Sequence, residues 1–287
     1  MAIKPRESLP YGIGRFTQTI KRFVDPMVRS MRFGGWLFGR GEDVSEAWQE
    51  KLRAHTPVFV YQMGKVASTS IFRSLQQQYS GCVFHGHYFS PNHNDAHIRE
   101  LYRYVDDASP PIKIISLVRD PFSRNISAFF QNFKRDTGME IDQCRKSMLQ
   151  LRDMFLKNYP HEIPWVWFDN NIKKHFGIDV YEHPFPKSGH IQITNQHVDL
   201  LLMKHDLDDA LKQQLVGEFV GIADFQISRS NVSAEKKYSQ YMDAFRQLKM
   251  PLWYLHRVCS TKYTKHFYYY QMRDLVDAWQ EPEENAA

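Results

Sequence analysis

The sequence predicts an α/β protein with a central parallel sheet flanked by helices. Short β-branched and aromatic runs alternate along the chain with helical repeats of apolar residues, and this alternation is typical of a parallel sheet. The 287 residues, 43% of them hydrophobic, are enough for one large core. We expect a single α/β domain at residues 56–287, preceded by a basic, amphipathic helical segment at residues 1–55.

The first strand is expected at residues 58–63, which are β-branched or aromatic in most positions. Gly64 breaks this run, and Ile71 and Leu75 then repeat at helical spacing. The pattern predicts a strand, a loop and a helix in succession.

A second unit follows after a His-rich connection. Residues 112–118 form an apolar strand, and the helix after it begins with Asp120 as a cap and Pro121 in the first turn. Its apolar stripe is expected to bury against the sheet, with Arg124 and Ser127 on another side. The stripe consists of Phe122, Ile126, Phe129, Phe130 and Phe133.

Three further helices are expected later in the chain. Phe168, Ile172 and Phe176 repeat at helical spacing, and Gly177 stands where such a helix would end. Residues 199–218 and 233–249 also have helical patterns. In a parallel sheet of this kind, ligands bind beyond the carboxyl ends of the strands, and both loops described next lie at such ends.

The loop after the first strand is a candidate anion site. Its residues put backbone N–H groups, an ammonium and hydroxyls at the start of a helix; they are Gly64, Lys65, Val66, Ala67, Ser68, Thr69 and Ser70. A full nucleotide-binding phosphate loop would need a glycine six residues before Lys65, where Phe59 stands inside the strand. The loop of an ATPase or GTPase is therefore incomplete here.

The end of the second strand offers another anion-binding pair. Arg119 and Ser127 are eight residues apart, or just over two helical turns, so both can face one phosphate. Taken alone, the same residues would fit a surface arginine and serine beside a helix cap.

Together the two loops resemble the sulfotransferase superfamily, a P-loop-like fold. The resemblance implies that the first loop grips the 5′-phosphosulfate of 3′-phosphoadenosine 5′-phosphosulfate (PAPS), and that Arg119 with Ser127 grips its 3′-phosphate. It implies PAPS as cosubstrate and no metal. Residues 60–68 and 119–121 are also similar to a bacterial branch described as capsular polysaccharide synthesis proteins, with weaker echoes at 165–186 and 221–270.

The sequence departs from the superfamily in two places. The first loop lacks the glycine and closing aromatic of the cytosolic members, and the late Gly-rich adenosine motif is missing, so the adenine pocket is not assigned. Residues 263–268 resemble a carboxyl-terminal signature of the bacterial branch. They are expected either to touch the cosubstrate or to be the packed aromatic start of a helix.

The candidate base comes from His85-Gly86-His87. A neutral imidazole can accept the proton of an acceptor hydroxyl, and the same triplet in uronosyl 2-O-sulfotransferases implies that His87 is the base and His85 its support or an acceptor contact. Two alternatives compete for these histidines: a metal site that also draws on His93, Asp95 and His97, and core or surface histidines without function. A glutamate base is a further alternative, for which the candidates are Glu100, Glu140 and Glu162.

Charge and cysteine content limit where the protein can be located and what it can bind. Residues 1–41 hold eight Lys or Arg and two Asp or Glu, so this segment either packs on the body or makes a peripheral contact with an anionic membrane. Three widely spaced cysteines and the lack of a long apolar stretch or signal peptide predict a cytoplasmic protein. No nucleic-acid recognition motif is present, and the oligomeric state cannot be predicted.

These observations predict a PAPS-dependent sulfotransferase acting on an acceptor hydroxyl, of a carbohydrate or capsular polysaccharide, by in-line transfer with a histidine base. Two alternatives are a P-loop nucleotide kinase or NTPase, and a non-catalytic nucleotide-binding factor in polysaccharide assembly.

Overall fold

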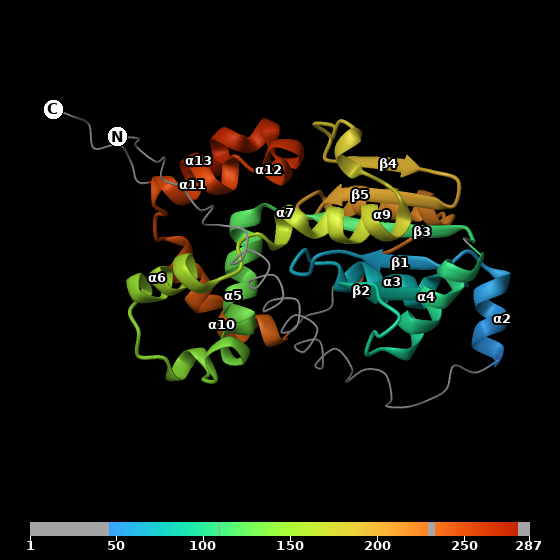
Figure 1. Cartoon of the computed structure of the whole chain (residues 1–287), viewed down its shortest axis with the longest axis horizontal. Coiled ribbons are helices and arrows are strands. Elements are labelled where there is room, and N and C mark those ends of the chain that lie inside the picture. Colours follow the sequence, from blue (N-terminus) through green and yellow to red (C-terminus); the bar gives the residue numbers. More distant parts are fainter. Residues whose placement is uncertain (1–45, 109, 229–232, 281–287) are drawn as a thin grey trace, which may run out of the picture. The chain divides into compact units, whose positions relative to one another are not determined.

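A computed structural model of the chain describes residues 46–108, 110–228 and 233–280 (Figure 1). The basic stretch 1–41 lies outside these residues. The elements follow the chain in the order α2 (Glu46–Ala54), β1 (Val58–Tyr61), α3 (Thr69–Gln78), β2 (Val83–Gly86), α4 (Ala96–Ala108), β3 (Ile112–Val118), α5 (Pro121–Thr137), η2 (Ile141–Gln143), α6 (Met148–Asn158), α7 (Ile163–Phe168), η3 (Asp169–Lys173), α8 (Lys174–Phe176), η4 (Val180–Glu182), β4 (His190–Thr194), β5 (Val198–Lys204), α9 (Asp209–Val220), α10 (Ser233–Arg246), α11 (Leu252–Cys259), α12 (Lys262–Phe267), η5 (Tyr269–Gln271) and α13 (Met272–Trp279).

The central sheet confirms the predicted α/β class. Its order is β2-β1-β3-β5-β4, in which β2, β1, β3 and β5 are parallel and β4 runs antiparallel to β5. Since the four parallel strands point the same way, the segments that follow them leave the sheet at one edge. That edge carries both predicted anion-binding loops.

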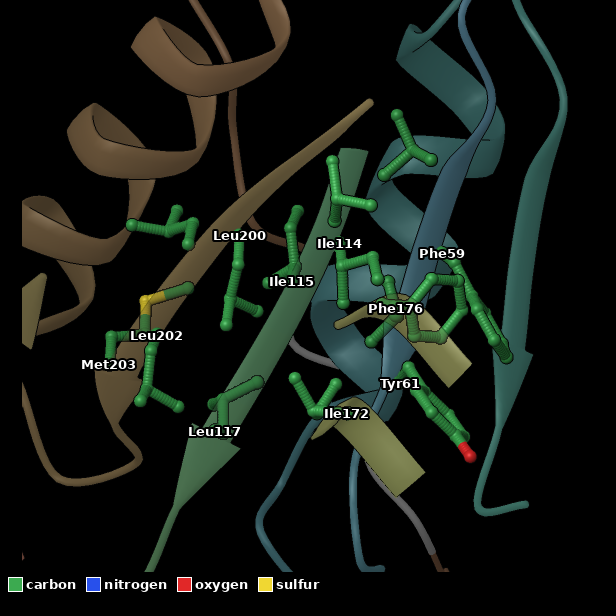
Figure 2. Packing of buried hydrophobic residues seen from close by; sticks show 14 of the residues in the cluster. Phe59, Tyr61, Ile114, Ile115, Leu117, Ile172, Phe176, Leu200, Leu202 and Met203 are labelled. Carbon is green, nitrogen blue, oxygen red and sulfur yellow. The ribbon is translucent and has the colours of Figure 1, made fainter. Parts of the chain in front are cut away.

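The interior of the sheet is a continuous apolar core. Figure 2 shows side chains of β1, β3 and β5 packed side by side, with Ile172 and Phe176 over β1. The ring of Phe176 lies 5.9 Å from that of Tyr61. The helical segment from α7 to α8 ends at Gly177, whose φ of +69° confirms the predicted helix end.

Helix α5 confirms its predicted caps but not its predicted packing partner. Asp120 caps it by accepting from the N–H of Ser123 at 2.8 Å, and Gly138 ends it in the left-handed conformation. Its phenylalanine stripe was expected to bury against the sheet. The stripe instead forms a second apolar cluster with α6, α10, α11 and α13, because α5 leaves the end of β3 and meets helices rather than strands (Figure 1).

One further prediction was wrong, and one strand was not predicted. Residues 199–204, predicted as helix, belong to β5, and the helix begins only at Asp209. A strand buried on both faces has the same continuous apolar run as a buried helix. The His-rich connection also contains a strand, because β2 includes His85. The helix predicted at 233–249 is present as α10.

A bilayer-spanning helix is absent from the described ranges, since none of their helices combines sufficient length with sufficient apolar character. Helix α2 lies in the predicted N-terminal segment, yet its Leu52 is buried in the core of the sheet domain. This helix is therefore packed as part of the α/β domain.

Candidate functional site

The loop after β1 has an unusual backbone. Gly64, Lys65 and Ala67 have φ values of +78°, +64° and +59°. The left-handed region costs a residue with a Cβ roughly 1 kcal/mol. Two non-glycine residues hold it within four positions, so the surrounding contacts must impose this conformation.

Two arginines impose it by binding three consecutive carbonyl groups. Arg124 donates to the oxygens of Met63 and Gly64 at 2.9 and 3.3 Å, and Arg119 donates to the oxygen of Lys65 at 3.0 Å. In a trans peptide the C=O and N–H groups point in opposite directions. The N–H groups of Lys65 and Val66 therefore point away from the guanidinium groups, which is the geometry of a backbone anion nest.

Arg124 is the residue that sequence reasoning missed. It was placed on α5 away from the apolar stripe and given no role, yet only 4% of it is exposed. Besides the loop, its guanidinium donates to Tyr159 Oη and Asn125 Oδ1, both at 2.9 Å. The usable signal was its spacing: Arg124 stands one turn after the cap Asp120, so its side chain points back toward the strand end.

Arg119 is held from the other side by α12. The hydroxyl of Tyr263 accepts from the N–H of Arg119 at 3.2 Å and donates to its carbonyl at 2.8 Å. Tyr263 is completely buried. The aromatic segment 263–268 thus starts a packed helix, as one of its two predictions stated, and at the same time fixes the backbone of a candidate phosphate ligand.

The remaining predicted ligands lie on the two helices. Ser68 is buried at the start of α3, where Thr69 and Ser70 form the first turn and are partly exposed. Ser127 is buried two turns into α5. Asp120 sits between Arg119 and α5, and burial raises the pKa of its carboxyl group.

His85 and Ser68 form a buried network with Gln62. The Gln62 side-chain oxygen accepts from the N–H of Gly64, so its amide nitrogen is the donor to Ser68 Oγ at 2.6 Å and to His85 Nε2 at 3.2 Å. His85 Nε2 must therefore act as an acceptor, also toward Ser68 at 3.0 Å. The network ties the end of β2 to the loop.

The close Ser68–His85 pair raises the question of a serine nucleophile with a histidine base. Burial and the neighbouring His87 ring lower the pKa of His85 to about 3, and a base that weak cannot activate a hydroxyl at neutral pH. Ser68 is also only 4% exposed. The pair is therefore a structural support for the loop.

His87 follows β2 and has the geometry of a base. Its Nδ1 lies 2.9 Å from the carbonyl oxygen of Gln62; because a carbonyl only accepts, Nδ1 carries the proton and Nε2 has the free lone pair. A Cβ placed on Gly64 would be 3.6 Å from this Nε2, so the lone pair borders the anion loop. Trp167 fixes the backbone by donating to the carbonyl of His87 at 3.0 Å.

The protonation state of His87 suits the same role. Burial lowers the pKa of His87; the bond to Gln62 opposes this shift, while the cations of Arg124 and Lys65 reinforce it. The imidazole is thus neutral at neutral pH and can accept a proton.

The end of β5 adds two basic groups to the same edge. Lys204 pairs in register with Val118, next to Arg119, and is only 6% exposed. It donates to Gln271 Oε1 at 2.7 Å, and burial lowers its pKa. Burial and the nearby Arg119 cation lower the pKa of His205 to about 4. Both were missed because this segment was predicted as helix.

The metal alternative finds no matching geometry in the described residues, and two of the three candidate glutamates form ion pairs. Within residues 46–108, 110–228 and 233–280, no three His, Cys, Asp or Glu side chains gather as metal ligands would. Glu100 forms an ion pair with Arg103 at 2.9 Å, and Glu140 forms one with Lys134 at 2.6 Å. Glu162 is the residue before α7.

Comparison with known proteins gives one match. Residues 138–269 are similar to a family described as "putative capsular polysaccharide synthesis protein". The matched part contains Tyr263 and Tyr159, which hold Arg119 and Arg124, but not those arginines or the loop after β1. Searches of the curated proteins and of the solved structures found no match.

Proposed function

We propose that this chain transfers a sulfonyl group from PAPS to a hydroxyl group of a carbohydrate. The observation that carries the proposal is the contact between Arg119 and the backbone of Lys65, 3.0 Å long and joining two strand ends. PAPS carries anionic groups at the 3′ and 5′ positions of one ribose, so its protein must hold cations at two neighbouring places. A lysine and an arginine at adjacent strand ends meet that requirement.

The loop after β1 would bind the 5′ end. Its nest of N–H groups and the Lys65 ammonium suit the phosphate, on which negative charge grows as the sulfur leaves. Loss of one such donor typically costs about 10² in rate. Arg119, with Ser127 in α5, would bind the 3′-phosphate. A guanidinium carries five N–H donors, so Arg119 can hold the loop and a phosphate together.

His87 would take the proton of the acceptor. The acceptor oxygen forms a bond to sulfur as the bond between sulfur and the 5′-phosphate oxygen breaks, and the hydroxyl proton passes to His87 Nε2. Adenosine 3′,5′-bisphosphate is then the second product. Within this assignment His85 positions the loop through Gln62 and does not touch the reacting atoms.

The support for a carbohydrate acceptor comes from the family match rather than from a contact in the site. The matched family is described by capsular polysaccharide synthesis, and polysaccharide hydroxyls are acceptors that a neutral imidazole can activate. We therefore propose a capsular type of polysaccharide, or a precursor of one, as the acceptor.

The kinase or NTPase alternative is less well supported. Phe59 is completely buried within β1, where that class of loop needs its first glycine. Asp120, which follows β3 as a metal-binding aspartate would, is engaged as the cap of α5. A non-catalytic nucleotide-binding factor would keep the same arginine contacts but would not need His87 Nε2 to border the loop.

The test is transfer of radiolabelled sulfate from PAPS to a panel of neutral and acidic bacterial polysaccharides. We expect label in at least one polysaccharide with the native protein and about 10²-fold less with Lys65→Ala. Intact binding of adenosine 3′,5′-bisphosphate with no labelled product on any polysaccharide would favour the non-catalytic factor.

A further inference from the structure

Exposed apolar side chains are concentrated on one small part of the surface. Seven large hydrophobic residues are exposed in the described part of the chain, and four of them come from α11 and η5. These four are Leu252, Trp253, Tyr269 and Tyr270. Single exposed apolar residues are common, whereas a cluster of them marks a surface that meets a partner.

A groove lies within this surface, and most of its exposed lining is apolar. It has a volume of about 550 Å³, and the helices around it, α11, α12 and α13, lie together in Figure 1. We call it the α11–α13 groove. Its lining residues are Leu252, Leu255, His256, Cys259, Ser260, Lys265, Tyr269, Met272, Val276 and Gln280. None of them belongs to the anion loop, so the groove is a separate feature.

The charge of this surface is net positive. Residues 252–280, which include α11, α12, η5 and α13, contain four Lys or Arg and two Asp, the latter being Asp274 and Asp277 of α13. Lys265 lines the groove, and Arg257 is exposed on α11. Lys262 is directed toward Asp169, at 3.8 Å, and Arg273 toward Asp277 on α13, also at 3.8 Å. The guanidinium of Arg257 lies over the ring of Trp165, 5.3 Å from its centroid. Lys265 is therefore the cation best placed to meet an anionic partner in the groove.

We propose that the α11–α13 groove and its aromatic rim dock on an anionic lipid surface. Tyrosine and tryptophan prefer the boundary between water and hydrocarbon, lysine and arginine attract anionic head groups, and the apolar groove accepts part of an acyl chain. An acidic polysaccharide would use the cations and the aromatic rings, but it would leave Leu252, Met272 and Val276 without apolar contact. The apolar lining therefore favours lipid.

This inference is independent of the proposed reaction, but the two features share an element. Helix α12 carries Lys265 toward the groove and the buried Tyr263 toward Arg119. A protein docked through the groove would hold its candidate active site close to the lipid surface. An acceptor that is assembled on a membrane would then be within reach.

The test is sedimentation of the full chain with vesicles. One set contains phosphatidylcholine alone and the other equal parts of phosphatidylcholine and phosphatidylglycerol. We expect stronger binding to the mixed vesicles, weakening as salt is raised. The double variant Tyr269→Ser/Tyr270→Ser and the single variant Lys265→Glu should each bind the mixed vesicles about tenfold less.

The matched control is Met139→Ser/Leu149→Ser, which removes two other exposed apolar side chains, 44% and 55% exposed, outside the groove. It should bind as the native chain does. The basic residues 1–41 are present in every variant, so unchanged binding by the groove variants would assign the membrane contact to that segment and overturn the proposal. Binding to an acidic polysaccharide but to neither vesicle set would overturn it as well.

Discussion

Arg119 Nη1 lies 3.0 Å from the backbone oxygen of Lys65, although 54 positions separate the two residues. The contact joins the segments that follow β1 and β3. Arg124 adds two bonds to the preceding carbonyls, so the conformation of the anion loop depends on the side chains of Arg119, which follows β3, and of Arg124 in α5. The first prediction follows from this dependence.

Replacing Arg124 should release the loop. Arg124→Ala removes both bonds to the loop carbonyls, and we expect at least about tenfold weaker binding of adenosine 3′,5′-bisphosphate, measured by calorimetry. Tyr159→Phe is the control, because it removes one partner of the same guanidinium, at 2.9 Å, and leaves the loop bonds intact. It should lower stability by about 1–2 kcal/mol in urea unfolding while leaving affinity within about twofold. Equal affinity losses in both variants would mean that Arg124 acts only on stability.

A pair of buried tyrosines offers a second comparison. Tyr263 and Tyr254 are both fully buried. The hydroxyl of Tyr263 donates to the backbone carbonyl of Arg119. The hydroxyl of Tyr254 bonds to His161 Nδ1 at 2.9 Å. Each Tyr→Phe change should cost about 1–2 kcal/mol of stability. Only Tyr263→Phe should also weaken binding of the 3′-phosphate, by about threefold to tenfold. The measured quantity is the ratio of the affinities for adenosine 3′,5′-bisphosphate and adenosine 5′-phosphate, which should fall by that factor. The same loss in Tyr254→Phe would remove the positioning role.

The rate of sulfate transfer should depend on a neutral His87. Because burial lowers the pKa of His87, the neutral form persists to lower pH than in free imidazole. The acidic limb of kcat/KM should therefore have its midpoint below about 6.5. His87→Gln should lower kcat by about 10² or more and abolish this limb. His85→Gln is expected to weaken bisphosphate binding instead. A native limb in His87→Gln would assign the base elsewhere.

Stability should fall with acidification through His161. Burial lowers the pKa of this imidazole to about 4, and only 2% of it is exposed. Below about pH 6.5 this histidine is protonated in the unfolded chain but stays neutral in the folded state. The free energy of unfolding therefore falls by about 1.4 kcal/mol per pH unit from about pH 6.5 down to about pH 4. Urea unfolding at pH 7 and pH 5 measures the summed slope, to which His85, His87 and His205 contribute in the same direction because their pKa values are also lowered.

The isosteric variant His161→Gln should reduce that slope by about the contribution of one histidine. Its amide can still accept from Tyr254 and donate to the carbonyl of Phe155, as the imidazole does at 2.9 and 3.0 Å. The exposed His197→Gln is the control for the loss of any histidine. An unchanged slope in His161→Gln, or an equal reduction in His197→Gln, would contradict the assignment.

The sequence was informative wherever local chemistry decides the structure. Asp120 and Pro121 start α5 by their own preferences. Gly64 marks the loop after β1, which ends at Tyr61, because glycine tolerates a positive φ. The loops at two strand ends could be paired because parallel strands all finish at one edge of a sheet. The class of the fold and the proximity of Lys65 and Arg119 follow from these features.

Tertiary packing decided the features that were missed. A run buried on both faces, residues 199–204, has no periodicity that separates strand from helix. The partner of the α5 stripe depends on the direction in which that helix leaves the sheet. The role of Arg124 was missed because two of its acceptors are backbone carbonyls of another segment, and backbone acceptors cannot be recognised from the sequence.

The most direct measurement of the central claim is calorimetric titration of the native protein with adenosine 3′,5′-bisphosphate, in parallel with ATP and magnesium. The account predicts saturable binding of the bisphosphate that falls at least about tenfold in both Lys65→Ala and Arg119→Ala. Saturable binding of ATP with magnesium, and none of the bisphosphate, would contradict it.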